Sequence, residues 1–99
     1  GGITEVKKIA AIADTFHVPI SPHNTKGPVG IVAAAHLMAS VPNVAPMELV
    51  TGIDWRDEII AKPLNIEGGR VYLPEGPGWG IELDMDGVEK HRWRPGDTR

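Results

Sequence analysis

The 99-residue sequence has no cysteine, which excludes disulfide bonds, thiolate zinc sites and a cysteine nucleophile. It also lacks an excess of positive charge, because ten Lys and Arg residues stand against thirteen Asp and Glu residues, a formal net charge of −3. A surface that binds nucleic acid or an anionic membrane is usually rich in Lys and Arg. The composition therefore predicts a protein with neither partner.

Long hydrophobic runs are missing as well. The longest run, residues 31–35, is far shorter than the roughly 20 apolar residues of a membrane-spanning helix. No charged segment followed by an apolar one opens the chain, so no signal peptide is expected and a cytoplasmic location is predicted. The length also excludes a complete (β/α)8 barrel, which needs about 250 residues.

The sequence up to residue 27 predicts a helix and then a strand. Apolar residues recur at three- and four-residue steps between Ile3 and Phe16, which is typical of an amphipathic helix, and Thr4 is a candidate N-cap. Residues 18–22 are short, β-branched and bounded by proline, so we interpret them as a strand. Residues 24–27 form the polar loop that follows.

A second helix and strand follow in the same order. Pro28 suits the first turn of a helix, and residues 29–40 are apolar nearly all round, which predicts a well-buried helix. Residues 46–50 are interpreted as a second short strand. Strands that alternate with helices predict an α/β fold with a parallel sheet.

The second half contains shorter elements. Residues 54–60 are interpreted as a charged loop or one helical turn, and Gly68-Gly69 suggests a small hairpin. Asp84 is a candidate cap for a short helix over 84–91, and the tail from 92 to 99 is expected to fray.

Two residues stand where catalytic groups of parallel α/β folds gather, at the carboxyl ends of strands. His23 directly follows the first predicted strand and could accept a proton near neutral pH; the alternative is a surface loop histidine. Glu48 lies among apolar neighbours of the next strand, where an unpaired carboxylate is rare; it points either outward or into a site. Adjacent strands would place both at one edge.

The other ionisable residues favour structural roles. We interpret His36 as a satisfied core residue, His17 as a partner of the helix dipole, and His91 as solvated. The acidic residues between 54 and 58 have no fixed loop pattern, which favours a solvated charged loop over a metal site.

Several short segments occur in a recognisable order and at a recognisable spacing: 1–5, 8–10, 21–24, 34–37, 39–43 and 77–83. With Glu48, they resemble the mandelate racemase branch of the enolase superfamily, and within it the galactonate and gluconate (acid-sugar) dehydratases. Glu48 resembles the glutamate that ends the eighth barrel strand. Trp79 departs from the pattern, since leucine is usual there.

The resemblance implies a fold and an origin. Residues 1–60 would be units seven and eight of a partial TIM-like barrel, and residues 61–99 a C-terminal extension that packs on an N-terminal cap. The chain would then be a C-terminal fragment of a longer enzyme. The metal-binding carboxylates of the family lie on strands three to five, so Mg²⁺ is expected in the full-length parent and not on this fragment.

The resemblance also implies a reaction on a sugar-acid substrate, the abstraction of the proton alpha to a carboxylate with loss of the β-hydroxyl. His23 resembles the base and Glu48 the residue that contacts the enediolate oxygen, while Asn24 and Trp55 are candidate substrate-binding residues. Racemase or epimerase chemistry is one alternative. A non-catalytic module that associates with itself is another, and exposed sheet edges predict a homo-oligomer in either case.

Overall fold

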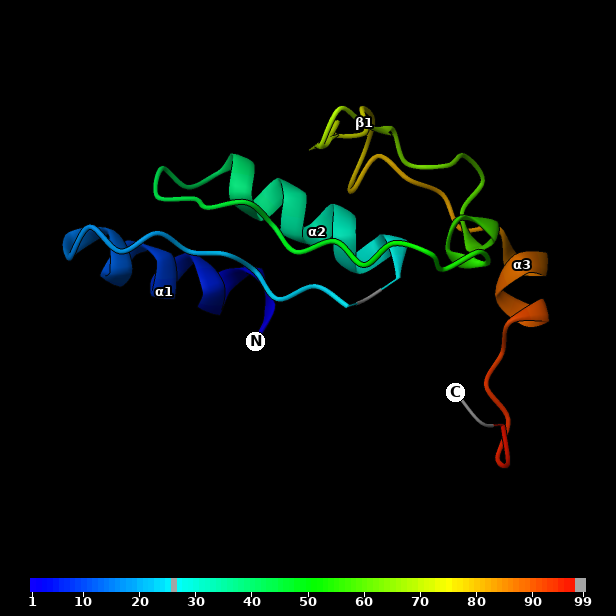
Figure 1. The fold of residues 1–99 in the computed structure, drawn as a ribbon. Helices are drawn as coiled ribbons and strands as arrows, with labels where there is room; N and C mark the ends of the chain where they lie inside the picture. The colour runs from blue at the N-terminus through cyan, green and yellow to red at the C-terminus, as the bar shows by residue number, and fades with distance from the viewer. Residues whose placement is uncertain (26, 98–99) are drawn as a thin grey trace.

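The computed structural model describes residues 1–25 and 27–97, and Figure 1 shows their arrangement. The radius of gyration is 15.0 Å and the extents are 45 × 32 × 25 Å, against about 13 Å for a compact domain of 100 residues. The chain is therefore elongated. Its elements are α1 (Gly2–Thr15), α2 (Pro28–Ala39), the 3-10 turn η1 (Arg56–Ile59), β1 (Ile66–Glu67), β2 (Arg70–Val71) and α3 (Met85–Lys90).

The first helix is confirmed, but its ends differ from the prediction. It begins at Gly2 with Gly1 as N-cap, so Thr4 lies inside the helix and the prediction that it caps the helix is wrong. At the other end His17 has a φ of 56°, and the N–H groups of His17 and Val18 donate to the carbonyls of Asp14 and Ala13. This is a Schellman cap, with histidine at the left-handed position where glycine is usual.

The two segments predicted to be strands run side by side in parallel, but they are joined by an isolated bridge between Ile20 and Val44, and residues 46–50 form no strand. The Ile20 N–H donates to Asn43 O and the Ala45 N–H to Ile20 O, both at 2.8 Å. The second segment therefore pairs from residue 44, earlier than the predicted start at 46. In Figure 1 one segment follows α1 and the other follows α2, and the two segments run in the same direction as each other. A single bridge is not a sheet, so the partial barrel stays a prediction.

The side chain of Asn43 fixes the first helix to this parallel pair. Its amide nitrogen donates to the carbonyl oxygens of Ala10 and Val18, both at 3.0 Å. One carbonyl belongs to α1 and the other to the segment that follows it, so a single side chain ties both to the second parallel segment.

The core lies between α2 and the second half of the chain. Ile31 and Val32 of α2 are fully buried and pack with Ile60 and Leu64, and burying such a side chain contributes about 1.5–3 kcal/mol. Met47, Leu49, Ile59, Ile66, Val71 and Ile81 surround this cluster. Residues from both sides of position 60 thus share one core.

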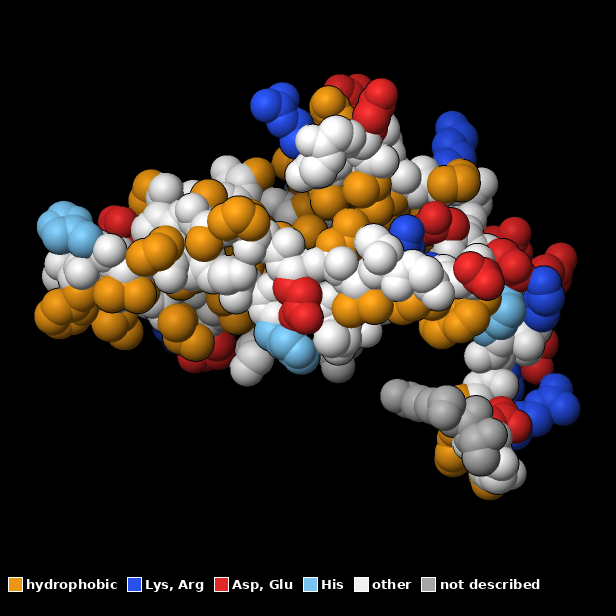
Figure 2. Space-filling view, viewed as in Figure 1, with side chains coloured by type: hydrophobic (Ala, Val, Ile, Leu, Met, Phe, Trp, Pro, Cys, Tyr) orange, Lys and Arg blue, Asp and Glu red, His pale blue; other side chains and the backbone are white. Residues whose placement is uncertain are grey.

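The first helix is much less covered. Among its residues only Ala10 is buried, while Ile9, Ile12 and Phe16 are exposed. Figure 2 shows hydrophobic side chains along much of the viewed face and charged ones gathered at the end that carries α3. Within the described ranges, no helix combines the length and the apolar character that a membrane span requires.

The hairpin and the last helix are confirmed. β1 and β2 pair antiparallel, with Ile66 opposite Val71, and Gly68 and Gly69 both have positive φ angles, as a tight hairpin turn requires. Asp84 Oδ1 accepts from the N–H groups of Asp86 and Gly87 at 3.0 Å each, so it caps α3 as expected.

Candidate functional site

The parallel pair brings His23 and Glu48 together. The Glu48 N–H donates to Pro22 O at 3.4 Å, which aligns the two segments just before the histidine. His23 Nε2 lies 3.5 Å from Glu48 Oε2, with 79% of the histidine side chain and 43% of the glutamate side chain exposed. The two side chains thus lie close together, as expected, and their catalytic roles stay predictions.

Asn24 supports this pair from beneath. Its backbone N–H donates to Glu48 Oε2 at 3.0 Å, and its side-chain amide donates to Met47 Sδ at 3.8 Å. The residue is only 3% exposed. Asn24 thus fixes the Glu48 carboxylate from a buried position, and a contact between its side chain and a substrate remains a prediction.

Trp55 lies at a cavity of about 1050 Å³ that begins close to the pair, since Thr25 and Gly27 also line it. The opposite wall comes from the end of α3 and the residues after it, including His91 and Trp93. Trp55 is 44% exposed, so solvent reaches part of this residue. Trp55 therefore shares a cavity with the loop after His23.

His91, which the sequence predicted to be solvated, is instead held by contacts, and that prediction is wrong. Its ring stacks on Trp55 with centroids 5.4 Å apart and an interplanar angle of 27°. Its Nε2 lies 2.8 Å from Glu58 Oε2, and 22% of its side chain is exposed. No sequence signal indicates this contact, because His91 at the C-cap of α3 lies far along the chain from Trp55 and Glu58, which are both at η1.

Glu58 is the centre of a second charged cluster. Lys90 Nζ lies 2.5 Å from Glu58 Oε2, the same oxygen that bonds His91. Hydrogen bonds from Lys90 first and His91 second lower the pKa of the Glu58 carboxyl below its ordinary value of 4.5, because both bonds favour the carboxylate. The charged segment predicted over 54–60 thus contains Glu58, which holds α3 in place through Lys90 and His91.

His36 has a partner in Trp79, which is distant in the chain, and this agrees with its predicted role as a satisfied structural residue. Its Nε2 lies 3.3 Å from Trp79 O, and the two rings are tilted by 49° with centroids 5.5 Å apart. A carbonyl accepts a hydrogen bond, so this contact requires the proton on Nε2.

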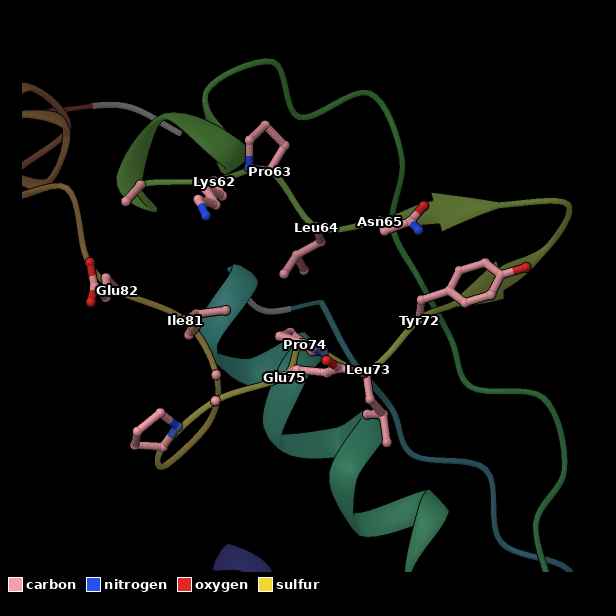
Figure 3. A pocket seen from close by; sticks show the side chains of 14 residues that line it. Lys62, Pro63, Leu64, Asn65, Tyr72, Leu73, Pro74, Glu75, Ile81 and Glu82 are labelled. Atoms are coloured by element: carbon pink, nitrogen blue, oxygen red, sulfur yellow. The ribbon is translucent and has the colours of Figure 1, made fainter.

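A second cavity, of about 690 Å³, lies under the hairpin. Figure 3 shows the segment with Lys62 and Leu64 on one side and the loop with Pro74 and Ile81 on the other. Neither residue of the His23–Glu48 pair lines it. It is a mainly apolar space away from the candidate site.

The described residues do not form a metal centre. Over 1–25 and 27–97, no three His, Asp or Glu side chains are placed to hold an ion together. The His23–Glu48 pair offers two ligand groups, whereas a protein-held Mg²⁺ is usually bound by carboxylates and water in octahedral geometry. The described residues therefore do not fit a magnesium site of their own.

Known proteins share this sequence and this fold. Residues 1–87 match the family described as "Enolase C-terminal domain-like". A D-xylonate dehydratase from Haloferax volcanii is 36% identical over 92 residues, which cover 92% of this chain and 22% of that protein. The chain spans about a quarter of the length of the relatives it matches.

Solved structures agree. A candidate mandelate racemase/muconate lactonizing enzyme from Burkholderia SAR-1 superposes with a TM-score of 0.87 at 37% identity, covering 99% of this chain and 25% of that one. A candidate L-alanine-DL-glutamate epimerase from Burkholderia xenovorans, bound to magnesium and fumarate, gives 0.81 at 31% identity, covering 91% and 23%. The chain therefore belongs to the enolase C-terminal domain-like family of mandelate racemase/muconate lactonizing enzymes.

Proposed function

We propose that this chain supplies the base and a charge-stabilising acid of an enzyme that dehydrates a sugar acid to a 2-keto-3-deoxy acid. The observation that carries the proposal is the exposed His23–Glu48 pair, 3.5 Å apart at the ends of two parallel segments. The similarity to a D-xylonate dehydratase supports the substrate class. The same similarity supports placing residues 1–60 as units seven and eight of a barrel, with residues 61–99 as an extension.

His23 acts as the general base in this proposal. Its side chain is 79% exposed, so a substrate can reach the ring. The neutral imidazole takes the proton on the carbon next to the substrate carboxylate, and the Glu48 carboxyl lies close enough to contact the product of that step. Removal of this proton creates an enediolate, whose negative charge must meet fixed positive or protonated groups.

Glu48 meets that charge when it is protonated, by donating a hydrogen bond to the enediolate oxygen. The Asn24 N–H holds Glu48 Oε2 at 3.0 Å, which keeps the carboxyl from turning away. The β-hydroxyl then leaves as water, taking up the proton that His23 removed. The resulting enol rearranges to the 2-keto-3-deoxy acid, so atoms and charge balance over the reaction.

Magnesium would have to be held by residues outside this chain. A bound divalent cation stabilises charge that develops on a carboxylate, and one structural neighbour is bound to magnesium. The described residues offer no group of ligands for it, and no step of the proposal is assigned to the ion. The chain's own contribution is the base, the acid and their support.

The test measures exchange of the substrate α-proton with deuterium oxide by NMR in the full encoded protein. His23→Asn should abolish exchange, because asparagine cannot accept the proton. His17→Asn is the matched control, since His17 has a positive φ that asparagine also adopts. Undiminished exchange in His23→Asn, or equal loss in both variants, would contradict the proposal.

Racemisation or epimerisation is the second candidate function, favoured by the similarity to a candidate epimerase. It begins with the same proton abstraction and returns a proton in place of losing the hydroxyl. The two reactions separate by product: dehydration forms a 2-keto acid, which a carbonyl reagent detects, and epimerisation forms none. Exchange without any keto product would favour the epimerase.

A non-catalytic module that associates with itself is the third candidate. Ile9, Ile12 and Phe16 form an exposed stripe on α1, and apolar surface of this kind favours association by roughly 25 cal/mol per Å² buried. Light scattering at micromolar concentration should then show a dimer that Ile12→Lys dissociates. A monomer with α-proton exchange activity would exclude this candidate.

A further inference from the structure

Trp55 is held in place by a residue from the other end of the chain. The His91 ring lies against the Trp55 ring at 5.4 Å and 27°, while Nε2 of the same ring bonds Glu58 Oε2 at 2.8 Å. The face of the His91 ring thus supports Trp55, and the edge of the same ring is fixed by Glu58. Histidine is the side chain that offers both an aromatic face and a strong hydrogen-bonding edge at this size.

The support is itself rigidly anchored. Asp84 N donates to Ile59 O at 3.1 Å and Ala61 N to Glu82 O at 2.9 Å, next to an antiparallel bridge between Ile60 and Leu83. A Cβ at position 87 would collide with the carbonyl oxygen of Glu58, so glycine lets α3 lie directly on η1. His91, the C-cap of α3, therefore has a fixed position relative to Trp55.

We propose that His91 is a positioning residue that holds the Trp55 ring at the wall of the 1050 Å³ cavity, ready to receive the hydroxylated part of the substrate. The inference rests on the proposed function, in which Trp55 contacts a sugar acid. The cavity suits such a ligand for two reasons. It is lined by Thr25, which lies two residues after His23 in the chain, and by Arg56, whose charge is opposite to that of a carboxylate. Without His91 the Trp55 ring loses its stacking partner and can rotate.

The charges around His91 come from both sides of the cavity. Glu58 on η1 faces its Nε2, and Lys90 on α3 bonds the same carboxylate oxygen. Arg56, Arg92 and Asp97 line the same cavity, with Arg56 paired to Asp57 and Arg92 to Glu89.

The first measurement is fluorescence, which detects the stack without any substrate. In a Trp79→Phe/Trp93→Phe background Trp55 is the single tryptophan. His91→Asn removes the ring that stacks on Trp55, so acrylamide should quench Trp55 emission more strongly in this variant than in the background protein. His36→Asn is the matched control and should leave the quenching unchanged; unchanged quenching in His91→Asn would overturn the proposal.

The second measurement separates positioning from simple structural support. In the otherwise unaltered protein, His91→Ala and His91→Asn should raise KM for the sugar acid by roughly two- to tenfold, the range expected for loss of one aromatic stack, with kcat changed less. His91→Phe keeps the ring and should restore KM. An unchanged KM in an active enzyme, or failure of His91→Phe to restore it, overturns the positioning role alone. Absence of α-proton exchange in the unaltered protein overturns the proposed function itself.

Discussion

The molecule contains two His–Glu pairs whose surroundings differ. His23 and Glu48 lie 3.5 Å apart with 79% of the histidine exposed. His91 and Glu58 lie 2.8 Å apart with 22% of the histidine exposed, and the same carboxylate oxygen also bonds Lys90. The first pair is open to a reactant, while the second is occupied by its neighbours.

The difference shows that residue types alone do not define a catalytic site. A general base must reach the proton it takes, and His23 can do so because its partner leaves most of its ring uncovered. The ring of His91 is engaged on its face by Trp55 and on its edge by Glu58. The second pair therefore holds α3 on η1, and the predictions below test this division of roles.

The largest expected effect comes from replacing the histidine of each pair in turn. His23→Asn should lower kcat/KM by about 10²–10⁴, the usual contribution of a general base, and change the free energy of unfolding by less than about 1 kcal/mol, as for an exposed ion pair. His91→Asn should show the reverse, with a smaller loss of kcat/KM and a larger loss in the free energy of unfolding. Steady-state kinetics and denaturant unfolding of both variants measure this, and a loss of activity that tracks loss of stability would erase the distinction.

Gly87→Ala should selectively weaken the contact between α3 and η1, where the second pair lies. The added methyl group would meet the backbone of Glu58 and Ile59, neither of which can move like a flexible side chain, and such overpacking costs about 1–3 kcal/mol. Thermal unfolding checks the change. Gly27→Ala is the control, because its Cβ would meet only Ile59 Cδ1 at 3.7 Å, an ordinary contact; equal destabilisation of both variants would argue against tight docking of α3.

Low pH should weaken the contact between α3 and η1, because Glu58 becomes protonated. Its pKa is lowered in the folded protein, so the unfolded chain binds the proton more readily than the folded one. The stability it contributes is full above its ordinary pKa of 4.5 and is lost as pH falls through the lowered value. The difference in melting temperature between the unaltered protein and Glu58→Gln should therefore shrink as pH decreases below 4.5.

A companion variant identifies the cause of this pH dependence. Lys90→Met removes the group that lowers the pKa of Glu58 most, so in that background the effect of Glu58→Gln should depend less on pH. A pH dependence that is the same with and without Lys90 would show that the lysine is not responsible.

Glu48→Gln should have the smallest effect on stability. Its side chain is half exposed, and glutamine keeps an oxygen that can accept from the Asn24 N–H, so the free energy of unfolding should change by less than about 1 kcal/mol. Chemical denaturation measures it. A larger loss would mean that Glu48 is a structural residue like Glu58.

Local features of the fold could be predicted because their causes are local. The apolar spacing up to Phe16 and the apolar run after Pro28 indicate helices that the structure contains. Asp84 caps α3 through bonds to the next turn, and two glycines form the hairpin turn. The edge shared by His23 and Glu48 also followed from sequence order, since neighbouring parallel strands end together.

Features that depend on contacts between distant segments were not predictable. Thr4 appeared to be a cap, yet the helix begins at Gly2, and a cap preference does not by itself fix where a helix starts. The second parallel segment pairs from Val44 because its register follows Ile20 and not its own composition. His91 looked like a solvated residue because its partners, Trp55 and Glu58, meet it only when α3 docks.

The sequence by itself determined the helices, the hairpin and the order of the two parallel segments, since spacing, glycine conformations and capping act over a few residues. Only the tertiary structure decided which histidine is free to react. That outcome depends on what covers each ring: solvent for His23, and an indole and a carboxylate for His91. Burial and pairing are properties of assembled segments, so the same two residue types became a candidate reactive pair in one place and an anchor in the other.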